Sequence, residues 1–362
     1  MTEPTTREIR AMLVGDLKAL VAELLPHAVA RGNYWQVGNF AGDKGQSLQI
    51  KDHGGWTEWD GGTTGDVFDL IARCHDWQDT KAHFADVMTF ARQFLGLDTA
   101  TTEEWQARRD KARARAAKRA KEQDEKRKVK QGAAKALWLK AAPDLRNTAV
   151  HAYLWARGVS LAQLAATCGR PGALRFSPDC YHPFARERYA AMLAQISGPG
   201  GFLAVHMTYL EYSPVYGWRG VTEREGIKKK LVYGEFAREG GSIKISKGMA
   251  DGKPGRPFKE MAKGERVWIT EGIEDALSLA LADPTRRIVS AVSLGNMGNV
   301  WLPDQCGGVV LVKDNDWDNP DAQKGFERAR QAYRDRGLKT GVFETPADCG
   351  KDVNDWLRGE VA

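Results

Sequence analysis

The segment Val267–Leu281, which reads VWITEGIEDALSLAL, contains one sharp boundary between two kinds of local structure. Its first four residues form a short apolar run, which is typical of a buried strand. The run stops at Glu271-Gly272, and from Ile273 onward apolar residues recur at helical spacing. The segment therefore predicts a strand followed directly by a helix, with a carboxylate at the point where the strand ends.

The same alternation continues to the C-terminus. Strands are predicted at 288–292, 309–312 and 340–343, and helices at 321–336 and 352–357. Alternation of this kind indicates a parallel sheet covered by helices. In open sheets of this class, ligands bind beyond the carboxyl ends of the strands, which is where we expect Glu271, Asp314 and Asp316.

Three converging carboxylates repel one another unless a divalent cation joins them, and hard oxygen ligands favour Mg²⁺ or Mn²⁺. A metal held in this way neutralises charge on a phosphoryl group and lowers the pKa of a nucleophilic hydroxyl. An isolated D-x-D pattern is weak, because acidic residues are common in turns. A glutamate after one strand together with D-x-D after a later strand is a stronger pattern, and it predicts phosphoryl transfer.

Four motifs resemble the Toprim domain of bacterial DnaG-type primases: TEGIEDAL at 270–277, SLGN at 293–296, DND at 314–316 and GKDVND at 350–355. The resemblance is closest to primase-like proteins of plasmids, phages and other mobile elements. It implies that Glu271, Asp314 and Asp316 hold catalytic Mg²⁺.

The resemblance also assigns metal-site positions to Asp275 and Asp352. The family's D-P-D is replaced here by Asp352-Val353-Asn354, which puts a complete second metal site in doubt. Asp355 and Asp318 are the candidates to replace the missing carboxylate.

Upstream motifs look like the basic subdomain that precedes Toprim in these proteins: AYL at 152–154, RGV at 157–159, LRF at 174–176, HMTYL at 206–210 and KKLVYG at 229–234. In the family this subdomain lines a cleft for template, nucleoside triphosphate and nascent RNA. The resemblance makes Arg175, Lys229 and Lys230 candidate phosphate contacts, with Lys244 and Lys351 as further candidates. The alternative for any single lysine is a solvated surface.

The N-terminal segment 56–71 resembles the end of the primase zinc ribbon, but Glu58 and Gly61 stand where the family has cysteines. We therefore expect a small antiparallel sheet with no zinc, over 34–40, 47–51 and 56–60. Trp56 and Trp59 are candidates to stack on template bases. The alternative is that they are buried core residues.

The net charge of +6 is concentrated in one segment, Glu103–Lys130, which holds 12 Lys or Arg and 6 Asp or Glu. Because it contains no Gly or Pro, the segment predicts a long exposed helix, ending before Gly132. Arg113 and Arg115 are its candidate nucleic-acid contacts. The alternative is a solvated spacer helix, and both descriptions can hold together.

A chain of 362 residues is long enough for several domains, and we expect a multidomain protein of α/β and α+β class. The predicted parts are residues 1–100 (helix and zinc-ribbon-like sheet), 101–142 (basic helical linker), 143–263 (basic α+β subdomain) and 264–362 (Toprim, with a Rossmann-like parallel sheet). No apolar run approaches the length of a membrane span, and no secretory signal is present, so a bacterial cytoplasmic location is expected. The five scattered cysteines suggest neither disulfides nor zinc.

The resemblance implies a DNA primase that makes short RNA primers on single-stranded DNA with Mg²⁺ or Mn²⁺, using NTPs or dNTPs. The alternatives are a Toprim nuclease or topoisomerase-like enzyme, and a non-catalytic single-stranded-DNA-binding replication factor. No G-x-x-x-x-G-K-[ST] loop occurs in the chain, so we expect a separate replicative helicase as partner.

Overall fold

The computed structural model describes residues 4–59, 61–97, 102–224, 227–250, 252–315, 319–346 and 348–359, and it describes residues 102–109, 111–113, 115–116, 119 and 250 by their backbone only. The chain divides into two compact units, Met1–Glu125 and Lys126–Ala362. Within the described residues, no helix combines the length and the apolar character that crossing a membrane requires.

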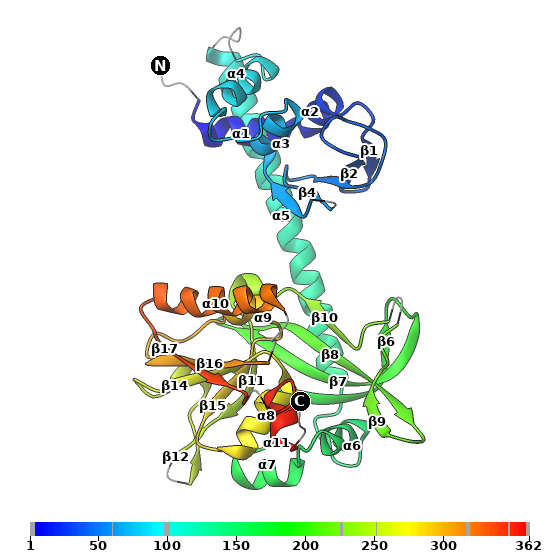
Figure 1. Cartoon of the computed structure of the whole chain (residues 1–362), viewed down its shortest axis with the longest axis vertical. Coiled ribbons are helices and arrows are strands. Elements are labelled where there is room, and N and C mark those ends of the chain that lie inside the picture. Colours follow the sequence, from blue (N-terminus) through cyan, green and yellow to red (C-terminus); the bar gives the residue numbers. More distant parts are fainter. Residues whose placement is uncertain are drawn as a thin grey trace. The chain divides into compact units, whose positions relative to one another are not determined.

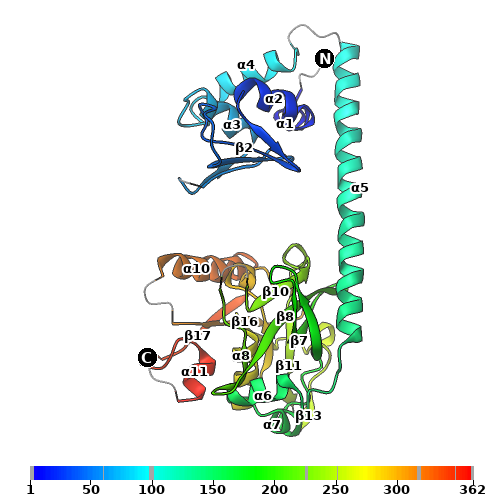
Figure 2. The same cartoon turned by 90° about the vertical axis from the view of Figure 1, so that its right-hand side faces the viewer.

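The first unit packs four helices against an antiparallel sheet (Figures 1 and 2). Its helices are α1 (Thr6–Gly15), α2 (Leu17–Leu24), α3 (Val67–Cys74) and α4 (Phe84–Phe94). Its strands, paired in chain order, are β1 (Val29–Arg31), β2 (Tyr34–Val37), β3 (Leu48–Lys51), β4 (Trp56–Glu58) and β5 (Thr63–Gly65). The expected antiparallel sheet is confirmed, with two strands more than the sequence indicated.

Two helices of the first unit, α1 and α3, start with a side-chain cap. The Thr5 hydroxyl accepts from the Glu8 N–H, and the Glu8 carboxylate accepts from the Thr5 N–H, which is a capping box. Asp66 and Asp69 form the same arrangement at the start of α3.

Helix α5 (Thr102–Lys140) is longer than the sequence indicated, because it does not end before Gly132. The residues after Gly132 are strong helix formers, and their apolar side chains are used in packing. Ala134, Leu137 and Trp138 lie in a cluster with residues of β7 and β8, and this burial stabilises the helix beyond the glycine.

The second unit contains an antiparallel sheet with the strand order β10-β8-β7-β6, and β9 pairs with β8. Its strands are β6 (Leu174–His182), β7 (Glu187–Gly198), β8 (Gly201–Ser213), β9 (Gly217–Gly220) and β10 (Lys230–Gly234). The C-terminal part of α5 packs on one face, and α6 (Ala149–Ala156) and α7 (Leu161–Thr167) lie in the core formed by the other face. Two 3-10 turns, Ala237–Glu239 and Phe258–Glu260, and the short hairpin β12 (Met249–Ala250) and β13 (Lys253–Pro254) follow.

The C-terminal sheet has the order β11-β15-β14-β16-β17. Its strands are β11 (Ile243–Lys247), β14 (Arg266–Thr270), β15 (Arg287–Ser290), β16 (Gly308–Lys313) and β17 (Lys339–Glu344), and its helices are α8 (Ile273–Ala282), α9 (Leu294–Met297), α10 (Pro320–Asp335) and α11 (Val353–Leu357). Four strands are parallel, and the edge strand β11 is antiparallel to β15. The predicted α/β and α+β fold class is confirmed.

Helices α8 and α10 cover opposite faces of this sheet (Figure 1). Side chains alternate along each strand, so Ile288 packs with α8 whereas Val289 packs with the α10 side. The core under α8 also contains residues of α6, α7, β7 and β8. The two sheets of the second unit therefore share one hydrophobic core, which fixes the C-terminal sheet against the upstream strands.

Candidate active site

Glu271 and Asp314 lie at the carboxyl ends of two adjacent parallel strands and line one small pocket. Glu271 follows β14 directly, and Asp314 follows β16. Lys313, the last residue of β16, and Gln323, on α10, line the same pocket. The expectation that these two carboxylates meet at one edge of the sheet is thus met in the described residues.

The backbone at Glu271 is fixed by hydroxyl groups of the two neighbouring strands. The Thr270 hydroxyl donates to the carbonyl of Gly272 at 2.7 Å, and the Ser290 hydroxyl donates to the carbonyl of Glu271 at 2.8 Å. Gly272 is required by close packing, since a Cβ there would lie 2.5 Å from Oδ2 of Asp275. The E-G pair thus lets Asp275 approach the backbone at the end of the strand.

Asn315, the middle residue of the D-N-D motif, ties the Asp314 loop to the segment that precedes α11. Its side-chain amide donates to the carbonyls of Pro346, Cys349 and Gly350 at 3.0 to 3.1 Å, and its backbone N–H donates to Lys351 at 2.7 Å. The sequence analysis missed this residue. An amide between two aspartates was the available signal, because a carboxylate in that position could not donate to three carbonyls.

Asp275 lies in the first turn of α8, is 4% exposed, and accepts a hydrogen bond from the N–H of Asn354 at 3.1 Å. Burial raises its pKa to about 7, and the negative charges of Asp352 and Glu274 act in the same direction. Asp352 is the N-cap of α11 and accepts from the N–H of Asp355. The structure therefore brings Asp275 and Asp352 together.

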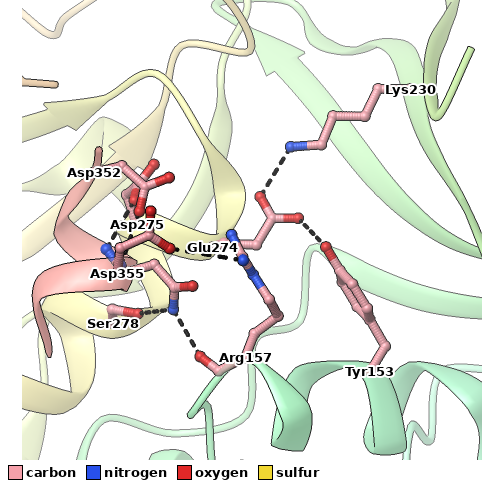
Figure 3. A network of polar contacts seen from close by, with 9 residues as sticks. Tyr153, Arg157, Lys230, Glu274, Asp275, Ser278, Asp352 and Asp355 are labelled. Atoms are coloured by element: carbon pink, nitrogen blue, oxygen red, sulfur yellow. Dashed lines mark hydrogen bonds and ion pairs between the residues drawn. The ribbon is translucent and has the colours of Figure 1, made fainter. Parts of the chain in front are cut away.

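Asn354 replaces a family carboxylate with a buried amide. The amide donates to the carbonyl of Arg157 at 2.7 Å and to the hydroxyl of Ser278 at 2.8 Å (Figure 3). Asp355 forms an ion pair with Arg157 at 3.7 Å. Asn354 thus ties α11 to α8 and to the end of α6. Because an amide is neutral, this position carries one negative charge fewer than it would with a carboxylate.

Glu274, like Asn315, was not among the predicted site residues. It is 4% exposed, and its carboxylate accepts from the hydroxyl of Tyr153 at 2.8 Å and from the ammonium of Lys230 at 3.1 Å (Figure 3). Burial by itself raises the pKa of Glu274, but Lys230 and the hydrogen bonds outweigh burial and hold that pKa well below its usual range. The sequence signal for Glu274 was a second acidic residue, beside Asp275, in a helix whose other residues are mostly apolar.

Family comparisons match two parts of the chain. Residues 266–362 match the model of the Toprim domain, and residues 128–242 match a domain of unknown function, DUF7146. The C-terminal part is a Toprim domain. The resemblance inferred from the motifs at 270–277, 293–296, 314–316 and 350–355 is confirmed.

Three similar solved structures are primases or parts of primases. They are the primase fragment of the bacteriophage T7 primase-helicase protein (17% identity, 58% of this chain and 69% of that chain, TM-score 0.35), a DNA primase domain from Pseudomonas aeruginosa (15%, 65% and 75%, 0.35) and the DnaG catalytic core (14%, 64% and 76%, 0.37). No curated protein matches the sequence significantly. The Toprim assignment rests on the family match and on the sheet topology.

The remaining predicted acidic residues of the Toprim domain, Asp316 and Asp318, lie outside the described residues. Within the described part of the chain, no three His, Cys, Asp or Glu side chains form a group that could hold a metal ion. The described Toprim residues instead provide one pair at the pocket, Glu271 and Asp314, and a second pair that consists of buried Asp275 and half-buried Asp352.

Several predicted phosphate contacts are engaged within the fold. The guanidinium of Arg175 lies 3.8 Å from the centroid of the Trp138 ring and donates to carbonyls at the end of α5, including that of Leu139 at 2.9 Å. The ammonium of Lys244 donates to the carbonyl of Ser197 at 3.1 Å, and burial lowers its pKa to about 7. Arg175 and Lys244 therefore contribute to packing at these positions.

The other predicted lysines have exposed or half-exposed side chains. Lys230 keeps 38% of its side chain exposed although its ammonium is held by Glu274, and the negative charge of Glu274 raises the pKa of Lys230. Lys229 is half-buried, with its stem packed over Gly220. Lys351 is exposed, and its carbonyl anchors Asn315.

The two tryptophans predicted to contact template bases, both in the first unit, differ. Trp56 is 3% exposed, and its indole N–H donates to the carbonyl of Asp66 at 2.9 Å. The prediction that Trp56 stacks on template bases is therefore wrong, because the ring belongs to the core of the first unit. Trp59 is 65% exposed. Arg113 and Arg115 lie on α5, and their side chains are outside the described part of the chain.

Proposed function

We propose that this chain is a DNA primase, a nucleotidyltransferase that makes short RNA primers on single-stranded DNA for a plasmid, phage or other mobile element. The observation that carries the proposal is the pair Glu271 and Asp314, which lines one pocket at the carboxyl end of the sheet in a Toprim domain. In the proposed reaction a 3′-hydroxyl attacks an α-phosphate, and pyrophosphate leaves.

The donor chemistry of this pocket suits Mg²⁺ or Mn²⁺. Mg²⁺ is commonly bound by one or two carboxylates together with waters and substrate phosphates, so the pair Glu271 and Asp314 is a sufficient protein contribution. Asp316 is the proposed third ligand. The bound ion would neutralise charge on the reacting phosphate and lower the pKa of the attacking hydroxyl.

The protein's own residues would position the substrates. Asn315 holds the Asp314 loop against residues 346–351, which keeps the carboxylate at the pocket. Glu271 is the proposed acceptor of the proton from the 3′-hydroxyl whenever it is not a metal ligand. Lys229, Lys230 and Lys351 are the proposed contacts for phosphates.

The side chains of the pocket favour polymerisation over strand cleavage through a covalent intermediate. Those described are two carboxylates, a lysine, an amide and apolar groups, which can bind metal and phosphate but cannot form a covalent link to DNA in the manner of a hydroxyl. A nuclease that uses a metal-bound water is therefore the main competing enzyme.

The test is incubation of the full chain with single-stranded DNA of mixed sequence, labelled NTPs or dNTPs, and Mg²⁺ or Mn²⁺. Asp314→Asn removes one pocket carboxylate, and Asp335→Asn on exposed α10 surface is the matched control. Template-dependent labelled products from the wild type and from Asp335→Asn, absent with Asp314→Asn or EDTA, support the proposal. Shortened DNA would instead indicate a nuclease, and binding with neither product would indicate a non-catalytic replication factor.

Arg113 and Arg115 are proposed as additional phosphate contacts on α5. Replacing both with Gln should lower the slope of log affinity against log salt by about 1.4 on single-stranded DNA. An unchanged slope would leave α5 as a spacer. A separate helicase remains the proposed partner.

A further inference from the structure

A second hollow lies on the upstream part of the second unit, between α6 and strands β6, β7 and β9. It is an open groove of about 920 Å³. Helix α6 and the residues just before it supply most of its lining, and β9, which is a neighbour of α6 in Figure 1, contributes Trp218. None of the residues used in the proposed reaction lines it.

Three aromatic rings line part of this groove. Trp155 of α6, Phe176 of β6 and Trp218 of β9 line it. Trp155 is 68% exposed, which is unusual for so large an apolar side chain. Trp218 is held by an edge-to-face contact with Tyr212 at 5.7 Å between ring centroids. An exposed ring and a fixed ring that line one groove are suited to a flat ligand.

Neutral polar groups also line the groove. Asn147, Thr148 and His151 line it, and the backbone of Asn147 is in the left-handed region with φ of 57°. The N–H of Asn147 donates to Nδ1 of His151 at 3.2 Å, which places the proton of the neutral imidazole on Nε2. Among the described residues, none that lines the groove carries a carboxylate. The groove thus combines stacking surfaces with hydrogen-bonding groups of no net charge.

Two arginines are sequence neighbours of residues that line the groove. Arg146 precedes Asn147, and its side chain, 63% exposed, pairs with Asp144. Arg219 follows Trp218 and pairs with Glu211 at 3.0 Å. Exposed ion pairs of this kind are weak, so a phosphate can exchange with either carboxylate. The described residues that line the groove carry no carboxylate and suit uncharged rings.

Helix α6 connects this groove to the acidic edge of the Toprim domain. Trp155 and His151 face the groove, whereas Tyr153 on the same helix donates to Glu274. An α-helix is about 10 Å across. A strand bound in the groove would therefore lie about one helix diameter from residues that adjoin Asp275.

We infer that the groove between α6 and β9 binds unpaired bases of single-stranded nucleic acid, with a base stacked on Trp155. This inference rests on the proposed function, since it gives a polymerase on single strands a holding site apart from the pocket of Glu271 and Asp314. Sequence-tolerant stacking suits such a site, because every base offers a flat face to an aromatic ring. A docked protein segment is the competing occupant.

The experiment measures binding of two fluorescent oligonucleotides of equal length by anisotropy, in EDTA and without nucleotides. One is oligo-dT and the other has the same backbone without bases. Trp155→Ala is compared with Phe184→Ala, which removes an aromatic ring of similar exposure, 64%, that does not line the groove. Trp155→Phe is the conservative variant.

Trp155→Ala should weaken oligo-dT binding about 10-fold while leaving affinity for the base-free strand unchanged, because only stacking is lost. Trp155→Phe should restore most of the affinity, and Phe184→Ala should stay within about 2-fold of the wild type. Equal affinity of Trp155→Ala and wild type for oligo-dT, or an equal loss with both strands, would overturn the inference. The first of those outcomes would leave the groove to a protein partner.

Failure of the groove and failure of the proposed function are separable. The binding assay contains neither metal nor nucleotide, so the difference between Trp155→Ala and wild type reports on the groove and not on catalysis. In primer synthesis, Trp155→Ala should raise the KM for template about 10-fold with kcat unchanged. If Trp155→Ala makes primers with an unchanged KM for template, the groove is refuted and the primase proposal stands. If binding depends on bases and on Trp155 but no primers are made, the groove stands and the primase proposal is refuted.

Discussion

Glu271 and Glu274 stand three residues apart at the start of α8, and the structure gives them opposite surroundings. Glu271 lines an open pocket with Asp314. Glu274 is enclosed, with Tyr153 and Lys230 as hydrogen-bond donors from the upstream part of the unit. A carboxylate that closes its own ion pair stabilises the fold, whereas one that faces a pocket can serve a substrate. The presence of a glutamate in the motif at 270–277 therefore does not by itself decide the role of that glutamate.

The largest expected effect separates the two glutamates by activity. Glu271→Gln should lower primer synthesis about 1,000-fold, because a charge that would bind the metal is removed. Its free energy of unfolding should stay close to that of the wild type. Single-turnover primer synthesis and urea unfolding of the same preparation measure both quantities. A Glu271→Gln protein with wild-type activity would abolish the distinction between the two carboxylates.

The second effect tests whether Glu274 is structural. Lys230→Met leaves the buried carboxylate without its ammonium and should cost about 3 kcal/mol of unfolding free energy, at the low end for such pairs because Lys230 is partly exposed. The double variant Lys230→Met/Glu274→Gln should recover most of that loss. Lys228→Met, an exposed neighbour, is the control in urea unfolding. If the double variant is as unstable as the single one, Glu274 and Lys230 are not coupled.

The smallest effect concerns His206 on β8, which lies within the field of Lys230 and Glu274. Burial lowers the pKa of His206 to about 4, and Lys230 lowers it further while Glu274 opposes the change. Nδ1 of His206 has no hydrogen-bond partner among the described residues. The folded state thus keeps the ring neutral, while the unfolded chain takes up a proton below pH 6.5. Stability contributed by His206 is therefore complete above pH 6.5 and is lost as the pH falls toward 4.

His206→Gln removes this dependence. Between pH 7 and pH 5 the wild type should lose about 2 kcal/mol more unfolding free energy than His206→Gln. Urea unfolding at a series of pH values checks this, with exposed His53→Gln as the control that retains the wild-type profile. Parallel pH profiles for wild type and His206→Gln would mean that the folded protein takes up a proton at His206 over the same pH range as the unfolded chain.

Local sequence was a reliable guide wherever a rule acts within one turn or one strand. The capping box at Thr5 and Glu8, the cap at Asp66 and the strand that ends at Thr270 all follow from residue types at short spacing. Gly132 was misleading, because a glycine breaks a helix only when neighbouring residues gain nothing from continuing it. Here Ala134 and Trp138 gain burial against the sheet.

Predictions that depended on which face is buried fared less well. Trp56 was a candidate both to stack on template bases and to be a core residue, and its position in β4 directs the ring into the core of the first unit. Alternation in a strand of three residues does not say which face meets the helices, since that depends on packing partners from distant segments.

The sequence by itself determined the alternation of strands and helices from residue 266 onward, the carboxylates at the strand ends and the concentration of positive charge on α5. These are properties of local pattern and composition. Only the tertiary structure decided that Glu274 is neutralised by Lys230, that Asn354 ties α11 to α8, and that Trp155 and Trp218 line one groove. Each of these contacts joins residues more than 40 positions apart, and burial, charge and shape act between such residues only after the chain has folded.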